Sequence, residues 1–165
     1  MTAAVTWEIP VGRGKAFLEE MPVVLDYILG GWQYTSAFRA YSGRPVLFGN
    51  ALAVSGNPKL DSPTFDRWFD ISMFAAQPSF TPRTNPVFYE GLNGPGAWFV
   101  DMTLTKGIPI GRYRLEARIE AYNAFNHLVW DQPDTTFGGG NFGKVTRKRT
   151  DSYGREIQVG VRFVF

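Results

Sequence analysis

The sequence predicts an all-β chain of antiparallel strands, and its composition and periodicity carry that prediction. Of 165 residues, 16% are aromatic and 19% are charged, and there are 18 glycines and 11 prolines. This composition favours strands separated by many turns over helices. The clearest segments alternate apolar and polar residues at every second position, which is the period of a strand. The length is that of one ordinary domain.

The first segments predict a strand followed by a short helix. Residues 3–9 alternate apolar and polar side chains, and Pro10 ends the strand because it offers no N–H to a neighbour. The glycines of the VGRGKAF segment permit a tight reversal. Residues 18–29 then place apolar side chains at roughly helical spacing, interrupted early by Pro22. We expect a turn and a short helix, which Gly30 and Gly31 end.

A second strand and a long loop follow. Alternation returns from Trp32 to Tyr41, a bend at Ser42 to Pro45 follows, and residues 46–48 are expected to continue the strand briefly. From 49 to 95 the periodicity disappears. A connection of this length within a compact domain is functional, disordered or placed on an exposed rim.

The second half of the chain predicts three more strands. They are expected at residues 98–105, at Tyr113–Tyr122 and at 155–165, and the link 107–111 joins the first two. The segment 141–150, NFGKVTRKRT, is a doubtful further strand inside the loop at 126–154. The sequence therefore predicts five well-patterned strands and one doubtful one.

The last strand has one apolar and one polar face, and two kinds of protein use such a strand. Ile157, Val159, Val161, Phe163 and Phe165 share one face. The pattern fits an outer-membrane barrel, whose strands are apolar outside and polar inside. It equally fits half of a soluble sandwich.

Three further observations favour the membrane barrel. The link at 107–111 is tight whereas those at 49–95 and 126–154 are long, as when one rim carries short turns and the other long loops. The polar face of the strand at 113–122 carries alternating charge, which an aqueous lumen solvates. Aromatic residues also fall near both ends of the strands, as in interfacial belts. Those expected near the tight rim are Trp32, Tyr113 and Phe165, and those near the other rim are Trp98 and Phe125.

Composition excludes several classes of function. The 17 basic and 15 acidic residues give a net charge of +2, too small a field to attract nucleic acid. Without cysteine there are no disulfides, thiolate metal sites or cysteine nucleophiles. The first residues, MTAAVTWEIP, show no signal peptide. We expect either an intracellular chain or the carboxyl-terminal part of a longer exported one.

No motif predicts catalysis, a cofactor or a metal. His127 is the single histidine and has no nucleophile or carboxylate at catalytic spacing. Asp131, Asp134 and Asn141 lack the pattern of a calcium loop. The glycines at 138–140 are not followed by the lysine and hydroxyl residue of a phosphate-binding loop. We therefore expect no enzymatic activity.

A series of motifs in order across nearly the whole chain resembles a known family. The motifs are GGWQYTSAFRAYSGRP, DRWFDISMFA, YEGLNGPGAWFVDMTLTK, YRLEARIEAYNAFNH, NFGKVTRKR and a terminal strand ending in Phe165. Together they resemble the carboxyl-terminal barrel of TonB-dependent outer-membrane transporters, and most of all the Oar-like branch with a carboxypeptidase-regulatory-like domain.

The resemblance implies that residues 1–165 are the last five membrane strands of a barrel of about 22 strands, an open sheet on its own. It implies location in the cell outer membrane, short links at 10–30 and 107–111, and long outer loops at 49–95 and 126–154. Function would be the import of a scarce solute using energy from the inner membrane. The implied partners are the rest of the barrel and its plug, the TonB system, the barrel-assembly machinery, lipid and the solute, with no nucleic acid.

Candidate site residues fall into three groups. Lumen-facing side chains, which equally fit a purely structural charge ladder, are Arg39, Asp101, Arg114, Glu116, Arg118 and Glu120. Loop aromatics that could contact a planar or sugar-like ligand, or only pack within the loops, are Trp68, Phe69 and Trp130. By resemblance, Phe163 and Phe165 are the terminal assembly signal.

The competing hypothesis is a soluble β-sandwich that binds carbohydrate or protein through the loop at 49–95. The two hypotheses differ in what covers the apolar faces of the strands. Lipid covers them in the first, and a second layer of the same chain covers them in the second.

Overall fold

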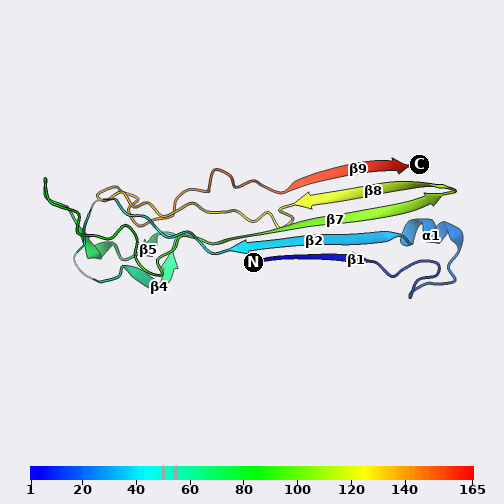
Figure 1. The fold of residues 1–165 in the computed structure, drawn as a ribbon, viewed down its shortest axis with the longest axis horizontal. Helices are drawn as coiled ribbons and strands as arrows, with labels where there is room; N and C mark the ends of the chain where they lie inside the picture. Colours follow the sequence, from blue (N-terminus) through cyan, green and yellow to red (C-terminus); the bar gives the residue numbers. More distant parts are fainter. Residues whose placement is uncertain (50, 54–55) are drawn as a thin grey trace. The chain divides into compact units, whose positions relative to one another are not determined.

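The computed structural model describes residues 1–49, 51–53 and 56–165 (Figure 1). The chain divides into two compact units, which are described separately. The sheet unit comprises Met1–Ala40, Trp98–His127 and Tyr153–Phe165. The loop unit comprises Tyr41–Ala97 and Leu128–Ser152.

The sheet unit is built on one five-stranded antiparallel sheet, as predicted. Its order is β1-β2-β7-β8-β9, so each strand lies beside its predecessor in the sheet (Figure 1). The strands are β1 (Thr2–Glu8), β2 (Trp32–Tyr41), β7 (Ala97–Ile110), β8 (Tyr113–Tyr122) and β9 (Glu156–Val164). The predicted all-β, antiparallel fold class is confirmed, and the sheet is open.

The register places like residues on like faces. Ile119 of β8 pairs with Leu104 of β7 and with Val159 of β9, so one apolar row crosses three strands. Ile119 is 49% exposed and Val159 is 74% exposed, and within the described residues no second layer covers this face. A soluble sandwich would bury these side chains. The observed face therefore does not fit the competing hypothesis.

The two edge strands of the sheet are β1 and β9. In the described part of the chain neither has a strand on its outer side. An edge strand presents unpaired N–H and C=O groups, and in lipid each such group costs several kcal/mol. The sheet therefore needs further strands on both sides before it can stand in a membrane.

The helix α1 (Val23–Leu29) is shorter than the predicted 18–29 segment. It starts directly after Pro22, whose fixed φ suits the entry to a helix and whose missing N–H would break one. Leu18 has a φ of 61°, outside the helical region. The helical spacing of Leu18 and Met21 was therefore coincidental, and residues 18–21 belong to the loop.

The predicted link at 107–111 is mostly strand. β7 runs to Ile110, which pairs with Tyr113, leaving only Gly111 and Arg112 as the turn. Gly111 has a φ of 60°, as two-residue hairpin turns require. Pro109 pairs with Arg114 inside the strand, where a proline is tolerated because the strand end is close.

The loop unit contains short strands and a core of its own. Residues 46–48 do not extend β2 as predicted, because Val46 and Phe48 are buried in that core at 0% and 4% exposure. Of the predicted loop at 49–95, residues 50, 54 and 55 lie outside the described residues. Its elements are β3 (Leu52–Ala53), β4 (Lys59–Thr64), β5 (Arg67–Phe69), the 3-10 helix η1 (Ile71–Met73) and β6 (Phe74–Ala75).

The doubtful strand at 141–150 is not formed. In place of a continuous ladder, the segment has isolated β-bridges, which pair Asp134 with Phe142 and Trp130 with Lys148. Gly143 has a φ of 82°, which turns the backbone away from an extended conformation. The segment is a folded loop instead.

Candidate functional site

The polar face of the sheet carries the predicted charged residues on adjacent strands. Glu116 pairs in register with Gly107 of β7 and with Arg162 of β9, and Arg118 pairs with Thr105 and Gly160. Because paired residues share a face, these side chains project to the same side. The period-two pattern of the sequence therefore predicted the membership of this face.

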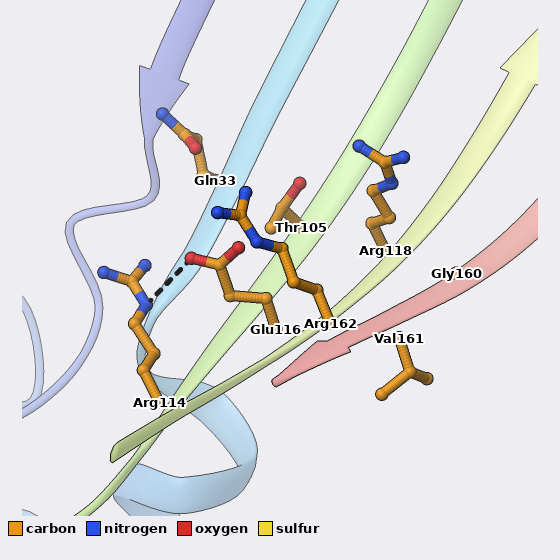
Figure 2. Close-up of a pocket in the computed structure, with 8 residues that line it drawn as sticks. All are labelled: Gln33, Thr105, Arg114, Glu116, Arg118, Gly160, Val161 and Arg162. Atoms are coloured by element: carbon orange, nitrogen blue, oxygen red, sulfur yellow. Dashed lines mark ion pairs between the residues drawn. The ribbon is translucent and has the colours of Figure 1, made fainter. Parts of the chain in front are cut away.

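A pocket of about 350 Å³ lies on this face, and arginines dominate it. Figure 2 shows Arg114, Glu116, Arg118 and Arg162 projecting from β8 and β9 to one side of the sheet, and Val161 to the other. The complete lining is Gln33, Thr105, Arg114, Glu116, Arg118, Gly160, Val161 and Arg162.

Two ion pairs run along β8. Arg114 Nε lies 3.2 Å from Glu116 Oε1, and Arg118 Nε lies 3.6 Å from Glu120 Oε2. The side chains of the two arginines are 60% and 59% exposed, whereas those of the two glutamates are 26% and 16% exposed. Exposed pairs of this kind contribute little to stability. Their main effect is to hold the guanidinium groups in place.

Two glycines make room for the arginines. A Cβ added to Gly107 would lie 2.7 Å from Nη2 of Arg114, and one added to Gly160 would lie 3.3 Å from Nε of Arg118. At the first distance the Arg114 guanidinium, the far end of a flexible side chain, would have to move aside. The guanidinium groups can therefore lie across the neighbouring strands because these positions have no side chain.

The pocket carries an excess of positive charge. The side chain of Arg162 has no hydrogen bond or ion pair to any residue that the structure describes, and Glu116 is the only carboxylate in the pocket lining. Three guanidinium groups thus face Glu116 in the lining and Glu120 beside Arg118, which leaves one guanidinium unmatched by a carboxylate. Guanidinium groups bind carboxylate and phosphate oxygens in bidentate geometry. The chemistry that this arrangement supports is attraction of an anionic group to the polar face.

Arg39 and Asp101 form a separate pair on the same unit. Arg39 Nη2 donates to Asp101 Oδ2 at 2.7 Å, linking β2 to β7. Asp101 Oδ1 also accepts the backbone N–H of Asn123 at 2.9 Å. The predicted lumen residues therefore fall into two groups, with Arg39 and Asp101 in one and the β8 residues in the other.

Sequence reasoning missed Gln33, Thr105 and Arg162 as site residues. All three occupy polar-face positions of the alternation, so period-two reasoning extended from β8 to its neighbours would have included them. The register was also needed, since only it places Arg162 opposite Glu116.

The three predicted loop aromatics lie in two different environments. Trp68 and Trp130 both lie against Phe65, with ring centroids at 6.1 Å and 4.9 Å, and Phe65 is 47% exposed. Phe69, in contrast, is fully buried and packs edge-on against Phe48 at 5.0 Å. Of the two alternatives for Phe69, ligand contact or packing within the loops, the buried ring fits packing in the core of the loop unit.

Carboxylates of the loop unit are held by local hydrogen bonds. Ser72 and Arg67 donate to Asp70 Oδ1, which holds the pKa of that carboxyl below its usual value. The backbone N–H of Thr136 does the same for the pKa of Asp134. These contacts are turn and helix caps. They order the loops.

The other candidate positions lie at the two ends of the sheet. His127 stacks on Trp98 at 4.3 Å, next to Phe125. Phe163 packs against Tyr113 at 5.5 Å, and Phe165 is 95% exposed. Two aromatic groups thus mark opposite ends of the strands, as interfacial belts do.

Metal clusters and membrane-spanning helices are absent from the described residues. No cluster of three or more histidine, aspartate or glutamate side chains there has the geometry to hold a metal ion. No helix in that part of the chain is long and apolar enough to span a membrane.

Comparison with known proteins then assigns the family. A family model described as outer membrane beta barrel domain matches residues 1–158. The chain belongs to the outer membrane beta barrel family. No curated protein and no solved structure matches the chain significantly.

Membership of the outer membrane beta barrel family indicates what each face of the sheet contacts. An outer membrane beta barrel is located in the outer membrane, and its strands turn apolar residues to lipid and polar residues to the interior. The exposed row around Ile119 and Val159 fits the lipid side, and the arginine pocket fits the interior side. The resemblance noted in the sequence is thus confirmed at the level of an outer-membrane barrel.

Proposed function

We propose that this barrel segment is part of a TonB-dependent outer-membrane receptor that binds a scarce solute and imports it with energy from the inner membrane. The observation that supports the proposal is an open, five-stranded sheet with an exposed apolar face and a charged opposite face. The motif series from GGWQYTSAFRAYSGRP to the terminal Phe165 resembles TonB-dependent transporters, and this resemblance supports the assignment to that class of barrel.

The segment would form part of the barrel wall and would not catalyse a reaction. About eight strands are the fewest that close a single-chain membrane barrel, so the five observed strands need partners along both β1 and β9. We propose that these partners are the remaining strands of a larger barrel with a plug inside. The barrel-assembly machinery would insert it through the terminal Phe163 and Phe165, and no enzymatic step or nucleic acid is involved.

The loop unit would contribute to recognition of the solute outside the cell. Loops on a rigid scaffold are common places for binding residues. Phe65, Trp68 and Trp130 form a partly exposed aromatic group, which suits a planar or sugar-like ligand. The polar face, with Arg114, Arg118 and Arg162, would set the charge of the interior wall.

Energised uptake tests the proposal. Cells would express the full-length protein containing this segment, and uptake of labelled candidate solutes would be compared with and without a functional TonB protein. We expect uptake to be lost without TonB while binding of the solute to intact cells persists. Uptake that continues unchanged without TonB would contradict the proposal and indicate a passive pore.

A control separates failed assembly from failed transport. Surface protease cleavage of the loop unit reports insertion, and it should be equal in both strains. Extending the reading frame upstream supplies a second check, because a plug and a signal peptide are expected there. An upstream frame without a plug would count against the receptor.

A further inference from the structure

The short helix α1 exposes most of its apolar side chains. Six of its seven residues are apolar, and none is buried in the structure. A helix that is apolar on nearly every side is normally buried in a core or in a membrane. The exposed fractions are 50% for Val23, 70% for Val24, 45% for Leu25, 47% for Tyr27, 59% for Ile28 and 44% for Leu29.

The end of α1 is bound by two residues of the sheet. Trp32 Nε1 donates to the carbonyl of Ile28 at 3.0 Å, and Lys106 Nζ donates to the carbonyl of Gly30. Lys106 pairs with Ala117, which pairs in turn with Val161. Paired residues share a face, so Lys106 projects from the apolar face. The helix end therefore lies on the side of the sheet that meets lipid.

Lys106 and the helix end compensate each other. A lysine on the lipid side of a barrel strand is destabilising, and so are the unpaired carbonyls at the end of a helix in an apolar medium. Lys106 is only 6% exposed, and its Nζ lies 5.4 Å from the centre of the Trp32 ring. A cation at a helix C-terminus also interacts favourably with the helix dipole. Such pairing is needed where water is scarce.

Charged residues precede the helix on the loop that leads into it. Arg13, Lys15, Glu19 and Glu20 are all exposed. Lys15 pairs with Glu8 at 3.3 Å, and the single charged residue of the helix, Asp26, accepts the backbone N–H of Arg13 at 2.9 Å. The polar loop and the apolar helix are thus adjacent, as at a boundary between headgroups and acyl chains.

We propose that α1 is an interfacial anchor: it lies in the membrane–water boundary at this rim of the barrel, with its apolar side chains among the lipids. Bilayer lipid is the occupant because the helix end is continuous with the apolar face of the sheet, which meets lipid in a membrane barrel. The inference rests on the outer-membrane location and not on the proposed transport. Lys106 and Trp32 position the helix.

Depth-dependent fluorescence quenching tests the anchor. Residues 1–165 contain no cysteine. In a full-length protein whose remaining cysteines, if any, are replaced by serine, Val24→Cys and Ile28→Cys variants can each carry one environment-sensitive dye. The probe is a phosphatidylcholine and phosphatidylglycerol vesicle containing lipids spin-labelled near the headgroup or deep in the acyl chain. An interfacial helix sits about 5–10 Å into the boundary. We expect the shallow label to quench both sites roughly two-fold or more over the deep label.

Matched variants calibrate the depth. Dye on Arg13→Cys should respond to aqueous iodide and little to the lipid labels, because Arg13 is in the polar loop. Dye on Ile119→Cys should be quenched more by the deep label than by the shallow one, which also verifies insertion. If dye at Val24 and Ile28 responds to iodide as dye at Arg13 does, and the lipid labels leave it unchanged, the anchor is overturned.

The role of Lys106 has its own readout. Lys106→Met should reduce lipid quenching of the dye at Val24 while leaving that at Ile119 unchanged, and Lys106→Arg should restore it. Unchanged quenching at Val24 in Lys106→Met would contradict the positioning role. Loss of quenching at both sites would show that the lysine supports the barrel as a whole and would equally overturn that role.

Discussion

Asn123 shows how much one side chain can organise at the end of a strand. It has a φ of 47°, which asparagine tolerates better than most residues, and it is fully buried. Its Nδ2 donates to the carbonyls of His127 and Tyr153, and its Oδ1 accepts the N–H of His127. One amide thus closes the segment after β8 and ties it to the segment before β9.

Asp70 carries the clearest prediction for a single residue. Hydrogen bonds from Ser72 and Arg67 lower its pKa in the folded state. The stabilisation is therefore present above the ordinary pKa of 3.8 and is lost as the pH falls through the lower folded value. Carboxyl NMR should give a midpoint below the ordinary 3.8 for Asp70. Ser72→Ala should raise that midpoint.

The control for this titration is Ser79→Ala in the same unit. Ser79 has no described bond to Asp70, so the midpoint of Asp70 should stay unchanged in that variant. A midpoint of Asp70 that is equal in Ser72→Ala and in the parent protein would refute the assigned cause.

At the scale of elements, β8 sets the two-sided character of the sheet. It contacts β7 on one side and β9 on the other over most of its length. Its residues alternate without interruption, so its apolar side continues the lipid row and its charged side forms the arginine pocket. A shift of one residue in register would exchange the two faces of a strand. The register of β8 therefore determines on which face its apolar and charged residues lie.

Paired substitutions on β8 test the face assignment. Ile119→Arg should lower the free energy of unfolding by about 2–4 kcal/mol, as measured for arginine on the lipid side near the bilayer centre. Arg118→Gln should cost less, because Arg118 faces the polar side. Urea unfolding of the reconstituted protein, followed by tryptophan fluorescence, measures both. A larger loss for Arg118→Gln than for Ile119→Arg would reverse the two faces.

At the scale of the molecule, the two units are stabilised by different means. The loop unit has an aromatic core of the usual kind, in which Phe48, Phe69 and Phe74 pack together with centroids between 5.0 and 5.8 Å. The sheet unit exposes its apolar face instead, which suits a protein whose outer solvent is lipid. Hydrophobic residues are thus buried in a core in the loop unit and face lipid in the sheet unit.

Removing one aromatic ring from the core of the loop unit should destabilise that unit and leave the stability of the sheet unit unchanged. Phe69→Ala should destabilise the loop unit by about 3–5 kcal/mol, since Phe69 is completely buried. Phe80→Ala is the matched control, because Phe80 is fully exposed and its loss should change stability by less than about 0.5 kcal/mol. Hydrogen exchange should show faster exchange in the loop unit and unchanged protection in the sheet.

Equal protection of the loop unit in Phe69→Ala and in the parent protein would contradict this account of the core. Loss of protection in the sheet as well would show that the two units unfold together. Either outcome is visible in one exchange experiment.

Much of the sheet could be predicted from the sequence, and for a local reason. β8 was predicted at Tyr113–Tyr122 and is observed there, because alternation at period two is written in consecutive residues. The faces of Arg118 and Ile119 followed from the same pattern. The link predicted at 107–111 and the helix predicted from residue 18 had wrong boundaries, since pairing across the hairpin and the position of Pro22 decided them.

The sequence by itself thus determined the five strands of the sheet and their two faces, because these depend on residues close together in the chain. Only the tertiary structure decided that Phe69 is core, that Arg162 lies opposite Glu116, and that Lys106 reaches the end of α1. Each of these is a contact between segments far apart in sequence. Local pattern does not encode such contacts, because they depend on register and on packing.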